Sequence, residues 1–227
     1  MDKKQNYIAI IGDIIQSKQE SKRANIQLKL EKTLKKINLE FSTSISANFM
    51  ITLGDEFQGL LHDATPTMRI LEILELALFP VRLRIGIGVG PITTSTIDRY
   101  VPLGSDGPAY YYAREMIDYL KSLQRKKKEA QSSCFIRSQH SDLDLLMNSL
   151  FSQLHFQKEN WTTRQYEIVF AYRTLQNQTA VAKELKITQS TVQKGLAAAG
   201  YYYYSNTLNT LQETTTRMLG GNDYELL

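Results

Sequence analysis

The sequence of 227 residues has one cysteine, Cys134, only five prolines and no long apolar run. A single cysteine cannot form an intramolecular disulfide, which excludes a disulfide scaffold. Apolar stretches such as Ile70 to Val81 are interrupted by Glu72 and Glu75 and are shorter than a membrane helix of about 20 residues, so we expect no membrane span. Because the apolar stretch of a signal peptide does not follow Met1, we expect a cytoplasmic protein.

The charge balance is also modest, with 27 basic and 23 acidic residues and a formal net charge of +4. This total does not by itself indicate a nucleic-acid-binding protein. Hydrophobic residues make up 42% of the chain, which is enough for a sizeable core and excludes a disordered or fibrous protein. The length favours one or two folded units, and we predict two domains, residues 1–157 and 158–227.

Strand and helix patterns alternate through the first domain. The expected order is a buried strand (7–12), a helix carrying Ile26 to Phe41, a hairpin (49–61), a helix after Pro66, a strand (82–90) and a helix from Pro108. This order predicts an α+β fold of the ferredoxin-like, cyclase-like βαββαβ type, with helices covering one face of a mostly antiparallel sheet.

Three glycines alternate along the expected strand 82–90. The period of two places Gly86, Gly88 and Gly90 on one face and apolar side chains on the other. Because glycine weakens a strand, its repetition indicates close approach to the backbone from that side. A packed helix, a ligand and a second subunit all explain the pattern.

Two aspartates lie at expected strand ends. Asp13 ends the first strand, and Asp55 lies beside the tip of the hairpin that we expect to pair next to it. Two carboxylates brought together repel each other, and a divalent cation such as Mg²⁺ relieves the repulsion while the phosphates of a nucleotide complete its coordination shell. The alternative is structural, because Gly-Asp is a common turn and an aspartate often caps a following helix.

The segments Ile11-Gly12-Asp13-Ile14-Ile15, Ile51-Thr52-Leu53-Gly54-Asp55-Glu56-Phe57 and Arg84 to Gly90 resemble the three consecutive core motifs of class III nucleotidyl cyclases. GGDEF cyclases and CRISPR polymerase palms share that plan. The Gly-Asp-Ile-Ile-Gln-Ser-Lys opening and the segment Asp106-Gly107-Pro108-Ala109 make the whole chain most similar to the SatD family of bacterial proteins.

The cyclase resemblance implies a catalytic and metal-binding role for Asp13 and Asp55, with the Ile14 carbonyl as a further ligand of Mg²⁺ or Mn²⁺. It implies that backbone N–H groups at a helix start hold the phosphates of a nucleoside triphosphate. The nucleotide-binding residues are then Ile14, Ile15, Gln16, Ser17, Lys18 and Asp106. Arg114 takes the role of the transition-state arginine. Glu56 is expected on the opposite strand face from Asp55, either as a surface residue or, as in GGDEF proteins, as a contributor to metal binding.

The carboxy-terminal part resembles a helix-turn-helix DNA-binding domain. Residues 178–197 show its spacing: Val181, Ala182 and Leu185 form an inner face, and Val192 and Leu196 anchor the second helix. We expect Thr188 to cap the second helix and Lys186 to occupy a turn position that often requires positive φ.

The second helix then presents polar side chains outward, where a recognition helix meets DNA. The expected DNA-binding residues are Gln189, Ser190, Thr191, Gln193 and Lys194, with Gln193 the first choice for a base contact. A helical hairpin used for protein contact is the alternative.

Together these patterns predict a nucleotide- and metal-responsive DNA-binding transcriptional regulator with DNA and nucleotide as partners. Because the net charge of residues 158–227 is small, we expect a homodimer, which doubles the contacts with DNA. One alternative is an active nucleotidyl cyclase or small nucleotide polymerase that uses two metal ions. The other is a non-catalytic protein-interaction scaffold.

Overall fold

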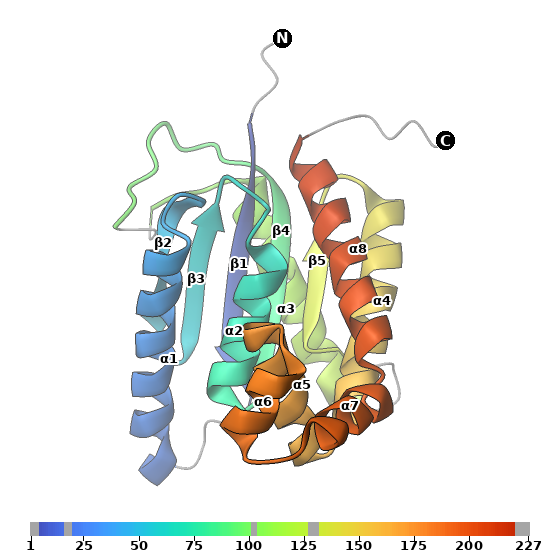
Figure 1. Cartoon of the computed structure of the whole chain (residues 1–227). Helices are drawn as coiled ribbons and strands as arrows, with labels where there is room; N and C mark the ends of the chain where they lie inside the picture. The colour runs from blue at the N-terminus through green and yellow to red at the C-terminus, as the bar shows by residue number, and fades with distance from the viewer. Residues whose placement is uncertain (1–4, 16–19, 101–103, 127–131, 221–227) are drawn as a thin grey trace. The chain divides into compact units, whose positions relative to one another are not determined.

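The computed structural model describes residues 5–15, 20–100, 104–126 and 132–220. Its centre is one five-stranded sheet in the order β2-β3-β1-β4-β5 (Figure 1). The strands are β1 (Asn6–Ile14), β2 (Ile45–Leu53), β3 (Glu56–Leu61), β4 (Leu83–Pro91) and β5 (Cys134–Arg137). All neighbouring strands are antiparallel except β4 and β5, which are parallel. The prediction of a mixed α+β fold with a mostly antiparallel sheet is therefore confirmed, and β5 is an addition to the predicted order.

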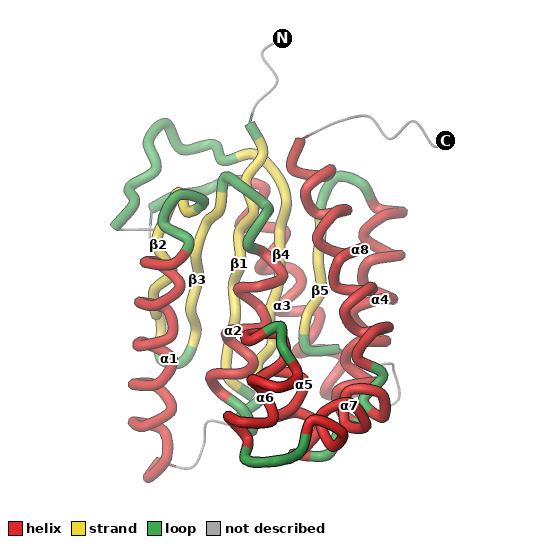
Figure 2. The backbone as a smooth tube through the Cα atoms, in the orientation of Figure 1, coloured by secondary structure: helices red, strands yellow, loops and turns green. Residues whose placement is uncertain are grey.

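Helices cover both faces of the sheet. Helices α1 (Glu20–Glu40) and α2 (Thr67–Leu78) lie on one face, and α3 (Pro108–Lys126) lies on the other (Figures 1 and 2). The prediction that helices cover a single face is therefore wrong. The reason lies in α3, whose buried residues Ala109, Ala113 and Ile117 form an apolar stripe that packs on β1 and β4. None of the described helices is both long enough and apolar enough to cross a membrane.

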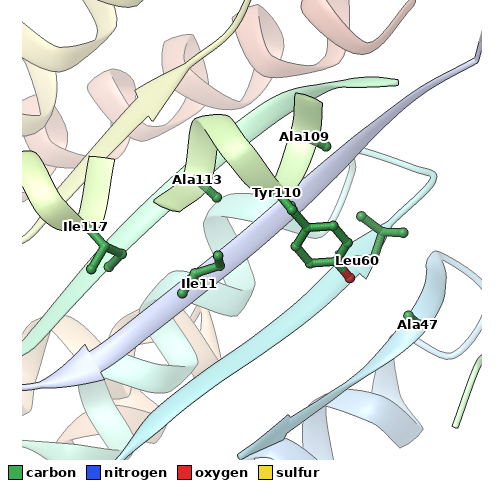
Figure 3. Close-up of a cluster of buried hydrophobic side chains, with 8 residues drawn as sticks. Ile11, Ala47, Leu60, Ala109, Tyr110, Ala113 and Ile117 are labelled. Atoms are coloured by element: carbon green, nitrogen blue, oxygen red, sulfur yellow. The ribbon is translucent and has the colours of Figure 1, made fainter. Parts of the chain in front are cut away.

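The glycine face of β4 is the surface that receives α3. A Cβ atom built on Gly88 would lie 1.9 Å from the Ala109 carbonyl oxygen, and one built on Gly86 would lie 2.2 Å from the Ala113 carbonyl oxygen. A packed helix thus explains the repeated glycines. Figure 3 shows the buried cluster that forms where α3 crosses the sheet. Its members are Ala9, Ile11, Ala47, Leu60, Ala109, Tyr110, Ala113 and Ile117.

At each edge strand of the sheet, an asparagine side chain from a helix makes hydrogen bonds with the strand backbone. Asn38 of α1 makes two hydrogen bonds with the backbone of Phe49 in β2, at 2.7 and 2.9 Å. Asn148 of α4 (Ser141–Glu159) makes the same two bonds with the backbone of Ile136 in β5, also at 2.7 and 2.9 Å. These bonds satisfy backbone groups that would otherwise offer a pairing edge to another chain.

The chain divides into two compact units, Met1–Ser152 with Leu211–Leu227, and Gln153–Thr210. The dividing points fall within α4 and α8 (Tyr201–Gly220), so the end of α8 belongs to the sheet-containing unit. There the Gln212 side chain donates to the Ala64 carbonyl and accepts from the Met68 N–H.

The second unit is helical and contains α5 (Thr163–Leu175), α6 (Gln178–Leu185) and α7 (Gln189–Ala198), which pack against one another. Val181, Ala182, Val192 and Leu196 are buried as expected. Lys186 has the predicted positive φ, 53°, and the Thr188 hydroxyl accepts a hydrogen bond from the Thr191 N–H at the start of α7.

Candidate functional site: a polar network beneath helix α3

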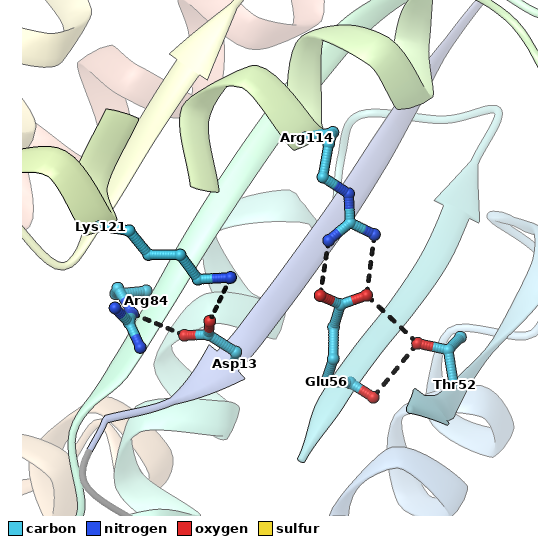
Figure 4. A network of polar contacts seen from close by, with 6 residues as sticks. All are labelled: Asp13, Thr52, Glu56, Arg84, Arg114 and Lys121. Atoms are coloured by element: carbon cyan, nitrogen blue, oxygen red, sulfur yellow. Dashed lines mark hydrogen bonds and ion pairs between the residues drawn. The ribbon is translucent and has the colours of Figure 1, made fainter. Parts of the chain in front are cut away.

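Asp13 lies near the end of β1 on the face that α3 covers. The register pairs it with Arg84 of β4, and the Arg84 Nε donates to Asp13 Oδ1 at 2.7 Å. Lys121 of α3 reaches the other carboxylate oxygen, with Nζ 3.1 Å from Oδ2 (Figure 4). Asp13 is only 6% exposed, and a buried carboxylate is costly unless it is paired. Arg84 and Lys121 neutralise its charge.

Glu56 begins β3, on the same face as Asp13. The last pair in the register is Gly12 with Phe57, so the next residues along the two strands are Asp13 and Glu56. Arg114 of α3 binds the Glu56 carboxylate through two nitrogens, at 2.5 and 2.8 Å, in the bidentate geometry that makes such pairs strong (Figure 4). The hydrogen bond from Arg114 lowers the pKa of Glu56 below its ordinary value near 4.5, and the Glu56 carboxylate raises the pKa of Arg114.

We call Asp13, Glu56, Arg84, Arg114 and Lys121 the α3 network. It contains two carboxylates and three basic groups, a formal sum of +1. Arg84 is additionally fixed by a hydrogen bond from its Nη1 to Gln124 at 3.1 Å. Arg114 and Lys121 are the more accessible members, with side chains 41% and 32% exposed.

The structure thus changes the expected role of Glu56. Its side chain is only 19% exposed and is held by Arg114, so the interpretation of Glu56 as a surface residue is wrong. The strand face decides this, because Glu56 shares with Asp13 the side that α3 covers. Asp55 lies in the tight turn between β2 and β3, where it is half-buried next to Gly54, whose φ is 63°.

The expected phosphate-binding segment is only partly described. Ile14 is buried at the end of β1, and the Ile15 N–H donates to the Arg82 carbonyl at 2.8 Å. The Ile15 N–H is therefore engaged by the sheet and does not face a phosphate, which corrects that part of the expectation. Gln16, Ser17 and Lys18 lie outside the described residues. Asp106 accepts a hydrogen bond from the Tyr111 hydroxyl at 2.5 Å, which raises the pKa of Tyr111.

Tyr110 lies one helical turn before Arg114 on α3. The residue is buried, with only 8% of its surface exposed, and yet its hydroxyl has no hydrogen-bond partner among the described residues. Burial raises the pKa of this phenol, since the charged form loses its hydration. An unsatisfied buried hydroxyl destabilises the fold, and Figure 3 shows this hydroxyl beside Leu60 within the apolar cluster.

The residues expected to bind DNA lie together at the start of α7. Gln189, Ser190, Thr191, Gln193 and Lys194 are all exposed. The opposite side of α7 is buried. There α5 packs closely against Gly195, because a Cβ built on Gly195 would lie 2.6 Å from Ile168 Cδ1 of α5.

Three basic members of the network were not anticipated as a group. Arg84 and Lys121 were not predicted, and Arg114 was assigned to catalysis without a partner. The period of two along β4 places Arg84 on the side of Gly86, and Lys121 follows Arg114 by seven residues, which places both on one side of α3. Once α3 is known to cover the glycine face of β4, these spacings predict that Arg84, Arg114 and Lys121 lie on the same side of the sheet as Asp13.

A divalent cation is the group that the cyclase resemblance implies. The carboxylates of Asp13 and Glu56 are hard oxygen donors of the type that Mg²⁺ prefers, but three basic groups surround them and the formal charge of the network is already +1. Both already bind basic side chains, so a metal ion and those side chains are alternatives at the same oxygens. Within the described ranges, three or more histidine, cysteine, aspartate or glutamate side chains are nowhere grouped as a metal site.

Comparison with protein families matches the description "SatD family" over residues 7–214. Comparison with curated proteins found no match.

Similar solved structures have low identity. A bacterial light-regulated adenylyl cyclase has a TM-score of 0.41 and 11% identity, covering 59% of this chain and 76% of its own. The guanylyl cyclase Cya2 has a TM-score of 0.35 and 10% identity, covering 52% and 71%. A regulator of polyketide synthase expression from Bifidobacterium adolescentis has a TM-score of 0.26 and 17% identity, covering 96% and 86%.

Proposed function

We propose that this chain, which belongs to the SatD family, is a nucleotide-responsive DNA-binding regulator of transcription. One observation carries the DNA-binding part. The start of α7 exposes five consecutive or near-consecutive polar side chains, while the apolar sides of α5, α6 and α7 are buried against one another. A helix in the DNA major groove needs this division between a buried side and a hydrogen-bonding side.

The connection between α6 and α7 supports the same proposal. The two helices are joined by three residues, 186–188, which is a length typical of a helix-turn-helix. The first helix ends in the left-handed conformation of Lys186, and the second begins with the Thr188 cap. Both devices fix the turn, and with it the direction of α7, through local hydrogen bonds.

Charge is distributed favourably for DNA in this unit. Between residues 153 and 210 there are six basic and three acidic residues. A net charge of this size gives a weak phosphate interaction for one copy, and we propose a homodimer whose two copies of α7 contact DNA together. Gln193 is the proposed base contact, since an amide side chain can pair with adenine through two hydrogen bonds. Lys194, Ser190 and Thr191 are the proposed phosphate contacts.

The DNA-binding proposal is tested by selecting duplexes from a randomised pool with the purified full chain at physiological salt. We expect a recurring sequence, and we expect Gln193→Ala to weaken its binding by about 1–3 kcal/mol and to relax the preference at one base pair. Gln178→Ala, a change of the same type at the start of α6, is the matched control. Selection that yields no recurring sequence contradicts the proposal.

The sheet-containing unit is the proposed sensor. The α3 network places carboxylates and basic groups on one sheet face, and a complex of Mg²⁺ or Mn²⁺ with a nucleoside triphosphate offers partners of both signs. We propose Asp13 and Ile14, together with Asp55 from the neighbouring turn, as metal-binding residues, and Gln16 to Lys18 with Asp106 as nucleotide-binding residues. Binding then alters the affinity of α7 for DNA.

Turnover of the nucleotide is a second candidate function. The observation that favours it is the position of Arg114, whose guanidinium lies on the same sheet face as the carboxylates. Incubation of the protein with Mn²⁺ and each ribonucleoside triphosphate separates sensor from enzyme. Cyclic or polymeric products that disappear in Asp55→Ala support catalysis, whereas binding without turnover supports the sensor.

A further inference from the structure

The C-terminal end of α7 is held by two side chains from outside the helix. The Ala199 carbonyl accepts hydrogen bonds from Trp161 Nε1 and from Gln157 Nε2, both at 2.8 Å. The same Gln157 nitrogen donates to the Gly200 carbonyl at 3.0 Å. From this geometry we infer that Gln157 and Trp161 are positioning residues, which set the direction of α7 without contacting DNA themselves. The inference rests on the proposed function of α7 as a DNA-binding helix.

Backbone hydrogen bonds already end α7 in a usual way. The Ala199 N–H donates to the Gly195 carbonyl at 2.9 Å, and the next N–H, of Gly200, donates to the helix at 3.0 Å. Gly200 then turns the chain with a φ of 64°, and its carbonyl accepts from the Tyr204 N–H of α8. A glycine in the left-handed conformation is the common exit from a helix. The two side chains therefore add something that such an exit lacks, which is a fixed connection to other elements.

Both donors are held by neighbours of their own. Gln157 lies on α4, the helix within which the two compact units divide, and Asn148 of the same helix is bonded to the backbone of β5. The Trp161 ring packs edge-on against Tyr204 and Tyr166, with ring centroids 5.1 and 5.6 Å apart. Supporting side chains fix a functional group well only when their own positions are fixed. The direction of α7 thus depends on α4 and on these aromatic contacts as well as on its own turn.

A small shift at this end would misplace the proposed base contact. Helix α7 has 10 residues and is therefore about 15 Å long. Its start is fixed by the Thr188 cap, so a displacement of about 1 Å at Ala199 rotates the helix axis by about 4°. Hydrogen bonds to a base edge tolerate only a few tenths of an ångström, whereas the attraction between a lysine and a phosphate falls off slowly with distance. We therefore expect loss of the two donors to reduce sequence discrimination and to leave non-specific affinity for DNA unchanged.

Fluorescence anisotropy of the full chain tests the inference with two labelled duplexes at one salt concentration, the sequence recovered by selection and a scrambled duplex of the same composition. Gln157→Met keeps the length of the side chain and removes the donor, and Trp161→Phe keeps an aromatic ring and removes the N–H. For each variant we expect the ratio of the scrambled to the selected Kd to fall at least fivefold, while the Kd for the scrambled duplex stays within twofold of the wild type. Gln153→Met, on the exposed face of α4, is the matched control and should keep the wild-type ratio.

The single tryptophan of the chain reports the position of the α7 end directly. Because Trp161 Nε1 is bonded to Ala199, a shift of this end changes the surroundings of the indole and its fluorescence emission. Without DNA, Gln157→Met should shift the emission maximum and Gln153→Met should not; an unshifted maximum in Gln157→Met would refute its hold on α7. Circular dichroism at the assay temperature establishes that each variant is folded, and if Trp161→Phe does not fold, Gln157→Met alone decides.

The outcomes separate this inference from the proposed function. If folded Gln157→Met keeps the wild-type Kd ratio within twofold, the positioning role is refuted while the DNA-binding proposal stands. If Gln157→Met weakens binding to both duplexes equally, the side chain has only a structural role, and the inference is refuted as well. If the wild type binds the two duplexes equally, the DNA-binding part of the proposed function fails, and this inference fails with it.

Discussion

Replacement of Gly88 by alanine should be strongly destabilising, because α3 lies directly against the backbone of β4. The added Cβ would be 1.9 Å from the Ala109 carbonyl oxygen and 2.5 Å from the Ala113 N–H nitrogen, both backbone atoms that cannot rotate away. Reaching an ordinary contact of 3.4 Å requires the helix to move outward by about 1.5 Å.

The magnitude follows from overpacking. Forcing an extra methyl group into a closely packed interface costs about 1–3 kcal/mol, and this position lies at the upper end because the obstacle is backbone. For a chain of this size a loss of about 2–3 kcal/mol lowers Tm by about 5–10 °C. The same displacement lifts Arg114 from Glu56 and Lys121 from Asp13, so we also expect both ion pairs to weaken.

Two other glycines on the same face of β4 supply matched controls. A Cβ on Gly86 would lie 2.2 Å from the Ala113 carbonyl oxygen, whereas one on Gly90 would lie 3.2 Å from its nearest neighbours. Thermal unfolding followed by circular dichroism should therefore rank Gly88→Ala as least stable, then Gly86→Ala, with Gly90→Ala within about 1 kcal/mol of the wild type. Equal stability of Gly88→Ala and Gly90→Ala would refute the close packing of α3.

Three further changes have definite expected outcomes. Glu56→Gln should lower the free energy of unfolding at pH 7 by about 1–2 kcal/mol, a value reduced because the Arg114 pair is partly exposed. Because folding lowers the pKa of Glu56 from about 4.5, this stability difference should shrink as the pH falls below 4.5 and through the folded-state pKa. Denaturant titrations from pH 7 to pH 3 measure the difference. Asn148→Ala should cost about 2 kcal/mol and promote aggregation, measured by light scattering, since two backbone groups of Ile136 lose their partner. Thr188→Ala should destabilise the second unit by about 1 kcal/mol and weaken DNA binding, which fluorescence anisotropy measures, because α7 loses its cap; affinity equal to the wild type would contradict a role for this turn.

Much of the fold could be predicted from local sequence patterns. The central strand β1, the hairpin of β2 and β3, and the buried side of α2 each follow from short-range periodicity, and the structure confirms them. The turn of the second unit could also be predicted, since the residues that stop α6 and cap α7 act through hydrogen bonds to their immediate neighbours.

The side of the sheet that α3 covers could not be predicted in the same way. Gly86 and Gly88 indicated that something approaches β4, but a helix, a ligand and a second subunit leave the same pattern in the sequence. The choice depends on Ala109 and Ala113, whose small side chains allow the close contact only when α3 folds back over the sheet. Strand β5 was missed because Cys134–Arg137 is too short to show an alternation.

The ion-pair partners of Asp13 and Glu56 could not be predicted either, because they lie far away in the sequence. Asp13 and Arg84 are 71 residues apart, and Glu56 and Arg114 are 58 apart, so their pairing appears only after strand order and helix placement are known. For Glu56 the sequence left open a surface position and a contribution to metal binding, because its ion pair with Arg114 depends on where α3 packs.

The proposed function requires a ligand of the sheet-containing unit to change the affinity of α7 for DNA. Its most direct test is the affinity of the full chain for its selected duplex, measured by fluorescence anisotropy at fixed salt, without ligand and with saturating Mn²⁺ and triphosphate. We expect a change of at least tenfold, about 1.4 kcal/mol, that is absent in Asp13→Asn. An identical affinity in both conditions, with calorimetry showing the ligand bound, would rule out control of DNA binding by that ligand.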